Sequence, residues 1–516
     1  MTRLLPFATV LLVALFGLST SAGAPTQPAP TQGPVTLRLL GVNDLHGHLE
    51  PPREGIGGAA WLKAGLDRAT LPGRTIRVHA GDMVGASPLI SSWFHDEPTI
   101  EAANRIGFDV GTVGNHEFDE GGAELMRLLR GGRRSGPEAL MEDALGGRVN
   151  TSSPGFRGAQ FPHLAANTLD RDGEPLLPPY LVVERAGVRV GFIGVTTPST
   201  PRFLLPRHAR RFRFTDTSDA VNRWVPALRR QGVEAIVVLA HEGAPTQDQE
   251  DVPSAHGPVV DEAREMSDEV DVIVAGHSHS NLNMTLPNVS RRGSKLIIEA
   301  GSYGVGFDLV DLRIDRSSGE VISASGTIEP TSHEGLPADQ GVAALVESYA
   351  RRVAPLAGLS LANAPNPLTR EGGELGTLVA HAQRAFAGTD VAVVTATSLR
   401  SDIDAGPVTY AEISQALAYG HPVLRVEIAG RDLRRLLAQS GRGLHLSGMR
   451  SVAGQMLLAD GRRLAPGDTY TLAASELLVT GDWLPVLRDA HRDARPTGSE
   501  VEALAWFLRQ GNPARP

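Results

Sequence analysis

The first half of the chain alternates short apolar runs, rich in β-branched residues, with polar or glycine-rich breaks and helix-compatible stretches. This alternation predicts an α/β domain built on a largely buried sheet. The strand candidates are residues 35–42, 75–79, 110–113, 188–195, 235–239, 270–274 and 295–299. We expect this first domain to span residues 35–330.

A break rich in Pro, Ala and Asn at residues 355–367 is the clearest boundary in the chain. A helix is expected just before it, over residues 338–353, so residues 331–367 are interpreted as a linker that contains a helix. A second α/β domain is expected over residues 368–516. It should include a helix at 375–386, strands at 391–394 and 424–428, and a last helix at 500–508. A length of 516 residues agrees with two large domains.

The N-terminus has the organisation of an export signal. Arg3 precedes an apolar run too short to span a bilayer, and small residues follow up to Ala24. We therefore expect a cleavable signal peptide over residues 1–24 and a disordered, Pro-rich spacer over 25–34. An uncleaved N-terminal anchor is the alternative. The mature protein should be secreted or extracytoplasmic and should contain no membrane span.

Composition excludes several classes of function. The chain has no cysteine, which rules out disulfides, Cys-ligated zinc and lipid attachment through cysteine. Its formal charge of −9 lacks the basic footprint of proteins that bind DNA or RNA polymers. DNA or RNA as a polymer ligand is therefore disfavoured, and the sequence leaves the oligomeric state open.

Five apolar runs end in Asp, His or Asn residues. The residues concerned are Asp44 with His46, Asp82, Asn115 with His116 and Asp119, His241, and His277 with His279. Ligands of open α/β sheets bind at the carboxyl ends of the strands, so these side chains should converge. Two pairs have i, i+2 spacing, which on an extended strand end points both side chains the same way. Since two carboxylates sharing a site repel each other, bringing Asp44 and Asp82 together indicates bound metal.

The same residues carry a family resemblance. Asp44-x-His46, Gly81-Asp82, Gly114-Asn115-His116-Glu117, His241 and Gly276-His277-Ser278-His279, in this order, resemble the calcineurin-like metallophosphoesterase motifs. NDLHGH, GNHEFD and GHSH followed by a second domain are similar to the secreted 5'-nucleotidase family, which includes UDP-sugar hydrolases and cyclic-nucleotide phosphodiesterases. The resemblance implies an α/β fold: an N-terminal β-sandwich flanked by helices in four αββα layers, and a smaller α/β substrate-binding domain.

The resemblance also implies a two-metal site. Asp44, His46, Asp82 and His279 would hold one metal, and Asp82 would bridge to a second metal completed by Asn115, His241 and His277. Nitrogen and oxygen ligands without sulfur suit Mn, Zn, Fe or Co. Two such ions lower the pKa of a bridging water, whose hydroxide attacks phosphorus, and clamp both ends of the in-line displacement.

His116 and Asp119 correspond to the catalytic dyad of the family. The resemblance implies that His116 stabilises the transferring phosphoryl group or protonates the leaving oxygen, while Asp119 orients the imidazole. Their spacing of three residues permits this contact on one helical turn. The alternative makes Asp119 a helix cap and His116 a further metal ligand. His48, His79 and His256 fill no motif position and are left out of the predicted site.

The second domain departs from the family where the substrate binds. By resemblance, the substrate-binding residues are Arg370, Arg400, Tyr419, Leu477 and Asp482. Tyr419 keeps one aromatic face of the clamp that holds a nucleotide base, but Leu477 replaces the second aromatic residue. A leucine recovers only part of the stacking energy, so either nucleotides bind more weakly or the substrate is not a nucleotide.

Together these features predict a secreted two-metal phosphoesterase that hydrolyses nucleoside 5'-phosphates. The alternatives with the same chemistry are a nucleotide-sugar hydrolase, a 2',3'-cyclic phosphodiesterase and a non-nucleotide phosphatase. A non-catalytic binding protein on the same scaffold is the alternative from another class.

Overall fold

The structure of the chain is a computed structural model. It describes residues 33–135, 143, 151–153, 155–245, 256–290, 293–438, 443–452 and 455–511. The expected signal peptide and nearly all of the expected spacer lie outside these residues. Residues 34–516 form one structural unit.

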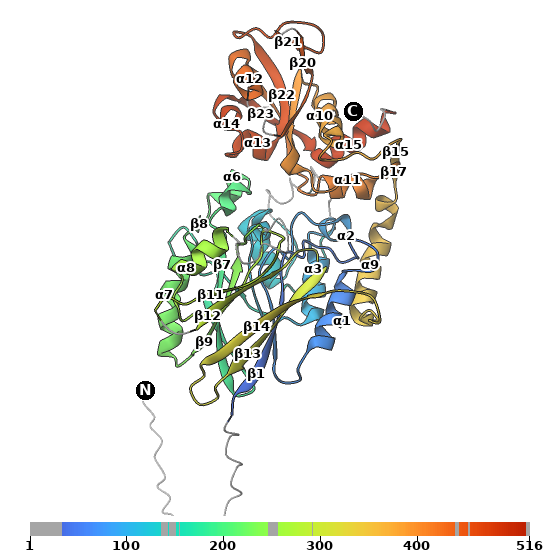
Figure 1. The fold of residues 1–516 in the computed structure, drawn as a ribbon. Coiled ribbons are helices and arrows are strands. Elements are labelled where there is room, and N and C mark those ends of the chain that lie inside the picture. The colour runs from blue at the N-terminus through green and yellow to red at the C-terminus, as the bar shows by residue number, and fades with distance from the viewer. Residues whose placement is uncertain are drawn as a thin grey trace, which may run out of the picture. The chain divides into compact units, whose positions relative to one another are not determined.

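Two six-stranded mixed sheets form the first domain (Figure 1). The order in the first sheet is β14 (Val321–Pro330), β13 (Gly306–Ile314), β1 (Val35–Val42), β2 (Thr75–His79), β3 (Val110–Thr112) and β4 (His163–Leu164). The order in the second is β11 (Asn281–Pro287), β12 (Ser294–Ala300), β10 (Val272–Val274), β9 (Ala235–His241), β7 (Val188–Thr196) and β6 (Tyr180–Arg185). All seven strands expected from the sequence are confirmed. The sequence analysis did not find β4, β6, β11, β13 and β14.

The main core of this domain lies between the two sheets. It includes Leu37 and Leu39 of the first sheet and Val237 and Val274 of the second, all fully buried. Each outer face is covered by helices: α1 (Ala59–Ala69) and α3 (Glu97–Ile106) on the first sheet, α7 (Thr217–Arg230) and α8 (Pro258–Glu265) on the second (Figure 1). The predicted four-layer αββα sandwich is therefore confirmed.

Shorter elements lie in the connections of this domain. They are α2 (Leu89–Ser92), η1 (His116–Phe118), α4 (Gly121–Arg130), η2 (Thr200–Arg202), α6 (Pro206–Ala209) and the strand pair β5 (Thr168–Leu169) and β8 (Arg213–Phe214). The η1 turn begins four residues after the end of β3; it contains His116 and is flanked by Asn115 and Asp119.

The expected break at residues 355–367 is not irregular. Helix α9 (Gln340–Ala357) continues through Pro355, and β15 (Ser360–Ala364) pairs with β17 (Gly406–Thr409). Pro355 lies in the last turn of α9, where the chain leaves the helix two residues later. The composition of this segment predicted an irregular break, but the segment forms the end of a helix and a β-strand.

The second domain is built on the five-stranded sheet β19 (Leu444–Ser447), β16 (Val391–Thr395), β22 (Thr469–Ser475), β18 (Pro422–Ala429) and β23 (Arg492–Ser499). Helices α10 (Glu374–Ala387), α11 (Tyr410–Ala416) and α15 (Glu500–Arg509) form one core with this sheet. Helices α12 (Gly430–Leu437), α13 (Glu476–Thr480) and α14 (Pro485–Ala490) form a second core. The hairpin β20 (Met449–Val452) and β21 (Gln455–Leu458) and the short turn η4 (Ala396–Ser398) complete the domain. The expected helices and strands of this domain are confirmed.

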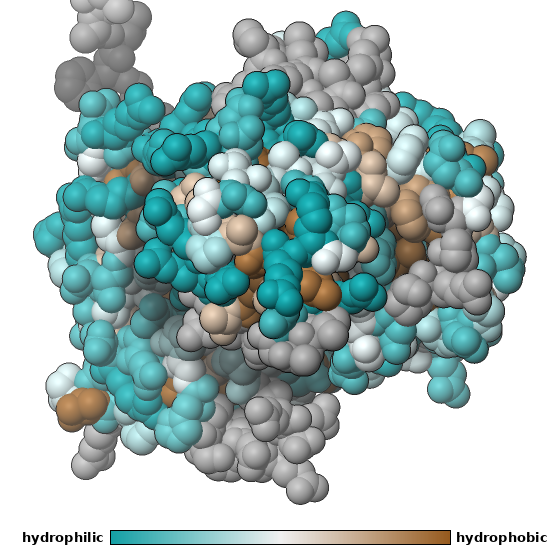
Figure 2. Space-filling model, turned by 90° about the horizontal axis from the view of Figure 1, so that it is seen from above, coloured by the Kyte–Doolittle hydropathy of each residue, from teal (hydrophilic) through white to brown (hydrophobic). Residues whose placement is uncertain are grey.

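The face seen in Figure 2 is largely hydrophilic, with hydrophobic residues in small separate groups. Within the described ranges, no helix is long and apolar enough to cross a membrane.

Candidate metal centre

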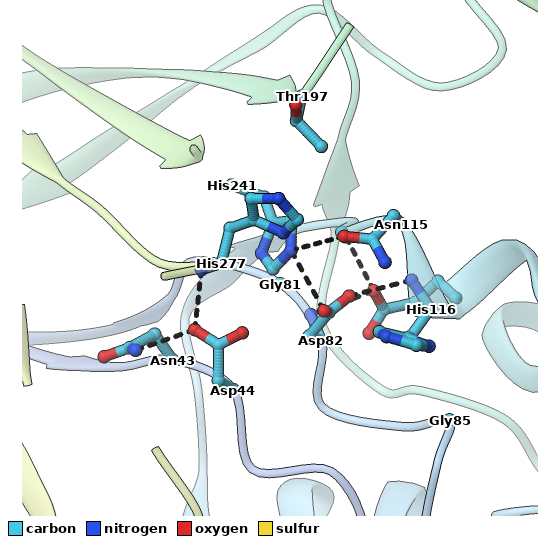
Figure 3. A network of polar contacts seen from close by, with 12 residues as sticks. Asn43, Asp44, Gly81, Asp82, Gly85, Asn115, His116, Thr197, His241 and His277 are labelled. Carbon is cyan, nitrogen blue, oxygen red and sulfur yellow. Dashed lines mark hydrogen bonds and ion pairs between the residues drawn. The ribbon is translucent and has the colours of Figure 1, made fainter. Parts of the chain in front are cut away.

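The predicted ligands meet at one edge of the two sheets. Asp44 and Asp82 follow β1 and β2, Asn115 follows β3, His241 ends β9, and His277 follows β10. Figure 3 shows these five side chains pointing toward a common space. The convergence expected from strand ends is therefore present in the structure.

The backbone at the ligands differs from the extended strand ends assumed from the sequence. Asp44, His46, Asp82, His277 and His279 have left-handed backbones, with φ of 47°, 46°, 47°, 72° and 57°. Non-glycine residues adopt this region rarely, and such residues cluster at functional sites. The i, i+2 pairs thus converge because tight loops turn both side chains inward, and not because a pleated strand alternates.

Two glycines allow these loops to approach one another. A Cβ atom on Gly81 would lie 2.6 Å from Gly114 N and 2.8 Å from His241 Nδ1. A Cβ atom on Gly114 would lie 2.2 Å from Asp82 Oδ1. A side chain at Gly81 would therefore displace His241, and one at Gly114 would displace Asp82 and His241.

One ligand cluster surrounds Asp44 Oδ1. This oxygen lies 3.3 Å from His279 Nε2 and 3.7 Å from His46 Nε2, and the two nitrogens are 3.1 Å apart. His46 Nε2 is also 3.7 Å from Asp82 Oδ2. The potential ligand atoms of Asp44, His46 and His279 all lie within 4.8 Å of one another.

A second cluster shares Asp82. Its Oδ2 lies 3.0 Å from His241 Nε2, which is 3.1 Å from Asn115 Oδ1 (Figure 3). The ligand atoms of Asp82, His241 and His277 lie within 4.8 Å of one another. Asp82 Oδ2 thus lies within 3.7 Å of a histidine nitrogen of each cluster.

Hydrogen bonds to the backbone orient the side chains of the clusters. His46 Nδ1 donates to Gly85 O at 2.8 Å and His241 Nδ1 donates to Ala80 O at 2.9 Å, so Nε2 is the atom that each ring presents to the clusters. Asp44 Oδ2 accepts from His277 N, whereas its buried Oδ1 has no hydrogen bond in the described part of the chain. These donors and the orphan oxygen fit bound divalent ions.

Charges at the site favour the same interpretation. Burial lowers the pKa of His46 to about 4, which keeps its imidazole neutral. Burial would also lower the pKa of His241, but the carboxylates of Asp82, Asp44 and Glu117 outweigh it and raise that pKa to about 10. The carboxylates thus attract a positive charge to this place, and a metal ion must displace the proton to bind.

His116 and Asp119 form a pair beside the clusters. His116 Nδ1 lies 2.7 Å from Asp119 Oδ2, and His116 N donates to Asp82 Oδ1 at 2.9 Å. Burial alone would lower the pKa of His116, but the charges of Asp119 and Asp82 raise it above its ordinary value. Asp119 thus pairs with His116 and does not cap helix α4, whose N-cap residue is Glu120.

Two buried carboxylates that the sequence analysis missed hold the ligand loops. Glu117 accepts hydrogen bonds from the backbone N–H groups of Asp82, Met83 and Gly114. Glu299 accepts from Ser278 Oγ at 2.7 Å, within the loop that carries His277 and His279. Glu299 ends the apolar run of β12, so the same strand-end pattern identifies it as a candidate.

The three histidines left out of the prediction differ in location. His48 packs against Tyr303, with ring centroids 4.1 Å apart, beside the metal clusters. His79 Nε2 lies 3.2 Å from His163 Nε2 within the fold, and His256 is exposed. Of the three, His48 is therefore close to the site.

Comparison with known proteins agrees with this geometry. A family model for the calcineurin-like phosphoesterase matches residues 37–281, and a model for the 5'-nucleotidase C-terminal domain matches residues 358–485. The chain belongs to the 5'-nucleotidase family. It is 32% identical to endonuclease YhcR of Bacillus subtilis over 89% of this chain, but it spans 38% of that protein's length.

Other members of the 5'-nucleotidase family match the whole chain. A 5'-nucleotidase of Vibrio cholerae is 23% identical over 98% of this chain and 95% of its own. The crystal structure of a 5'-nucleotidase precursor from Thermus thermophilus superposes with a TM-score of 0.72 and 26% identity, over 92% of this chain and 96% of that chain. The two-domain architecture is therefore that of solved 5'-nucleotidase structures.

The predicted substrate residues of this family member are only partly brought together. Arg400 donates to Tyr419 Oη at 3.4 Å, and Arg370 Nη1 donates to Arg400 O at 3.1 Å. Asp482 pairs instead with Arg488 and its side chain is 69% exposed, and Leu477 is half-buried on α13. The pocket beside the dyad, as far as the described residues define it, is lined by Tyr419 but not by Leu477 or Asp482.

Proposed function

We propose that this chain is a metal-dependent phosphoester hydrolase that binds two divalent ions, of Mn, Zn, Fe or Co, and releases phosphate from nucleoside 5'-phosphates. The observation that carries the proposal is the set of three adjoining groups of potential metal ligands. They are Asp44, His46 and His279; His46, Asp82 and His116; and Asp82, His241 and His277. When bound, two ions polarise the phosphoryl group and make a water nucleophilic at neutral pH. The chain's own contribution is to fix the ligands and supply the proton.

His116 is the proposed proton donor. Asp119 accepts from Nδ1–H, which fixes the orientation of the ring and leaves Nε2 to carry the second proton. The carboxylates of Asp119 and Asp82 favour the protonated ring, as the raised pKa indicates. His116 thus holds a proton at Nε2 for the leaving oxygen of a phosphate ester.

Arg400 is the proposed phosphate contact from the second domain. A guanidinium has five N–H donors and no acceptor, so Arg400 retains donors beyond those that its phenol neighbours accept. Tyr419 is the proposed base contact. Its ring is stacked near His421, at 5.4 Å and 14°, and near His116, at 5.7 Å and 24°, so a base must share the ring with these imidazoles. Arg370, Leu477 and Asp482 are proposed to complete the substrate site.

A phosphodiesterase is the second candidate function. YhcR, which aligns with 89% of this chain, is named an endonuclease, and the same two-metal chemistry cleaves a phosphodiester. The net charge of −9 argues against a polymer, so a small diester such as a 2',3'-cyclic nucleotide is the form that we retain.

A hydrolysis panel tests the proposal. AMP, UDP-glucose, 2',3'-cyclic AMP, p-nitrophenyl phosphate and bis-p-nitrophenyl phosphate are incubated with Mn-loaded protein, and phosphate and nucleoside are measured. We expect the highest kcat/KM for AMP. A preference for the cyclic nucleotide or the bis-ester supports the second candidate. No turnover of any compound above that of Asp82→Ala contradicts enzymatic function.

We also propose export, on the basis of the N-terminal sequence. Expression of the full chain in a secreting host should yield a mature protein that begins near Gly23 or Pro25. N-terminal sequencing of the exported material that returns Met1 contradicts cleavage.

A further inference from the structure

Tyr303, in the loop after β12, has a strained backbone that the metal ligation does not explain. Its φ is 59°, a left-handed value that a bulky side chain adopts only where the surrounding structure enforces it. Gly301 and Gly304 beside it are also left-handed, with φ of 64° and 67°. Tyr303 is therefore held in a position that an unconstrained loop would not give it.

The loop is attached directly to the ligand Asp44. Tyr303 N donates to Asp44 O at 2.7 Å. The side chain of Asn43 donates to Gly301 O at 2.6 Å and accepts from Ala300 N at 3.1 Å. These three hydrogen bonds fix the backbone of Tyr303 relative to the metal centre.

The ring of Tyr303 lies among three histidines. It makes edge contacts with the ligands His46 and His279, at centroid distances of 5.9 Å and 5.4 Å, and packs on His48 at 4.1 Å. Its hydroxyl oxygen accepts from Arg400 Nη2 at 3.2 Å. The side chain thus spans the distance from the first ligand cluster to the guanidinium proposed to bind phosphate.

The neighbours of Arg400 explain why a phenol is suited to this place. Within the described residues, the guanidinium of Arg400 donates hydrogen bonds to two phenols, those of Tyr303 and Tyr419. A carboxylate there would orient the guanidinium equally well but would neutralise its charge. A phenol oxygen orients Arg400 and leaves its positive charge for an anion.

We propose that Tyr303 is a positioning residue, whose hydroxyl orients Arg400 toward a phosphoryl group at the metal centre while its ring covers the His46 and His279 side. This inference rests on the proposed function, because it requires a phosphoryl group between Arg400 and the metal ligands. The sequence motifs assign no role to Tyr303.

Tyr303→Phe tests the role of the hydroxyl, because it keeps the ring and its contacts with the histidines. We expect KM for AMP and the Kd for inorganic phosphate, measured by calorimetry on Mn-loaded protein, to rise about tenfold. Metal content should stay at the wild-type level and kcat should change less than threefold. Tyr180→Phe is the matched control: its hydroxyl accepts from Gln231, and its loss should change neither constant.

A double-mutant cycle separates positioning from packing. If Tyr303 acts through Arg400, Tyr303→Phe should have no further effect on phosphate binding in an Arg400→Gln background. Equal effects in both backgrounds, or wild-type phosphate binding by folded Tyr303→Phe, overturn the inference. The phosphate titration needs no turnover, so it gives an answer even if the hydrolysis panel contradicts the proposed function.

Discussion

Replacing Asp119 with Asn tests the central chemical assignment, that His116 is a proton donor and not a further metal ligand. The substitution keeps the shape of the side chain and removes its charge. Asp119 Oδ2 lies 2.7 Å from His116 Nδ1, so the variant loses a charge-assisted hydrogen bond to the imidazolium.

The expected magnitude follows from this contact. Opposite charges about 4 Å apart attract by about 4 kcal/mol at an effective dielectric constant of about 20. The side chain of Asp119 is 23% exposed, so solvent screening reduces this value, and we expect a loss of about 2–3 kcal/mol. This loss corresponds to a decrease in kcat of about 30- to 150-fold.

The pH profile gives a second readout. Asp119 raises the pKa of His116, and the protonated ring is the form that donates to the leaving oxygen. Activity should therefore be lost as the pH rises through the pKa of His116, and in Asp119→Asn this alkaline limb should move to lower pH.

The assay is initial-rate kinetics on AMP from pH 5 to pH 10, together with metal analysis. Asp261→Asn, which removes a carboxylate from an exposed pair with Arg264, should behave as the wild type. Loss of metal from Asp119→Asn, or an alkaline limb that does not move, refutes the assignment and favours His116 as a ligand.

Three further substitutions test other parts of the structure. Asp82→Ala removes the shared ligand and should lose both metals and nearly all activity while the fold is retained; full metal occupancy contradicts the bridging role. Burial raises the pKa of Glu500 from 4.5 to about 7, so the folded state holds the proton more tightly than the unfolded state. Stability from this group is complete below about pH 4.5 and is lost as the pH rises through about 7, by about 3 kcal/mol at most. Urea unfolding at pH 5 and pH 8 should show a smaller pH dependence in Glu500→Gln; an unchanged dependence contradicts this account. Leu477→Phe tests whether residue 477 belongs to the substrate site although it does not line the pocket of Tyr419: a KM for AMP lowered about tenfold, with no effect on p-nitrophenyl phosphate, supports the nucleotide-specific interpretation, and equal effects on both substrates remove it.

The strands that carry the ligands were predictable because each is a continuous apolar run. Strand β13 was not, because Asp308, Asp311 and Arg313 interrupt its pattern. Asp308 is nevertheless fully buried, and burial raises its pKa well above the ordinary value. A carboxyl group in the middle of a core strand opposes the hydrophobic pattern on which strand prediction depends.

The convergence of the candidate ligands was likewise predictable from strand ends, but the residues that hold them in place were not. Tyr303 is a single tyrosine in a loop, which no sequence pattern distinguishes. Its proposed role depends on a left-handed backbone that only the surrounding contacts produce. The flanking Gly301 and Gly304 are the one local sign of a tight turn. In the second domain, Arg370 and Asp482 pair with neighbouring carboxylate and arginine side chains, which a comparison of motifs does not reveal.

Because several predicted metal ligands have left-handed backbones, the metal content of the protein should depend on how well the fold is packed. Each such backbone costs about 1–3 kcal/mol, which the packing of the two sheets around the loops must offset. Chelation should therefore leave the protein folded, unlike small domains that fold only around their metal. A cavity in the core between the sheets, such as that made by Leu39→Ala, should release these loops before the domain unfolds. The number of metal ions bound per chain should then fall when core packing far from the site is weakened.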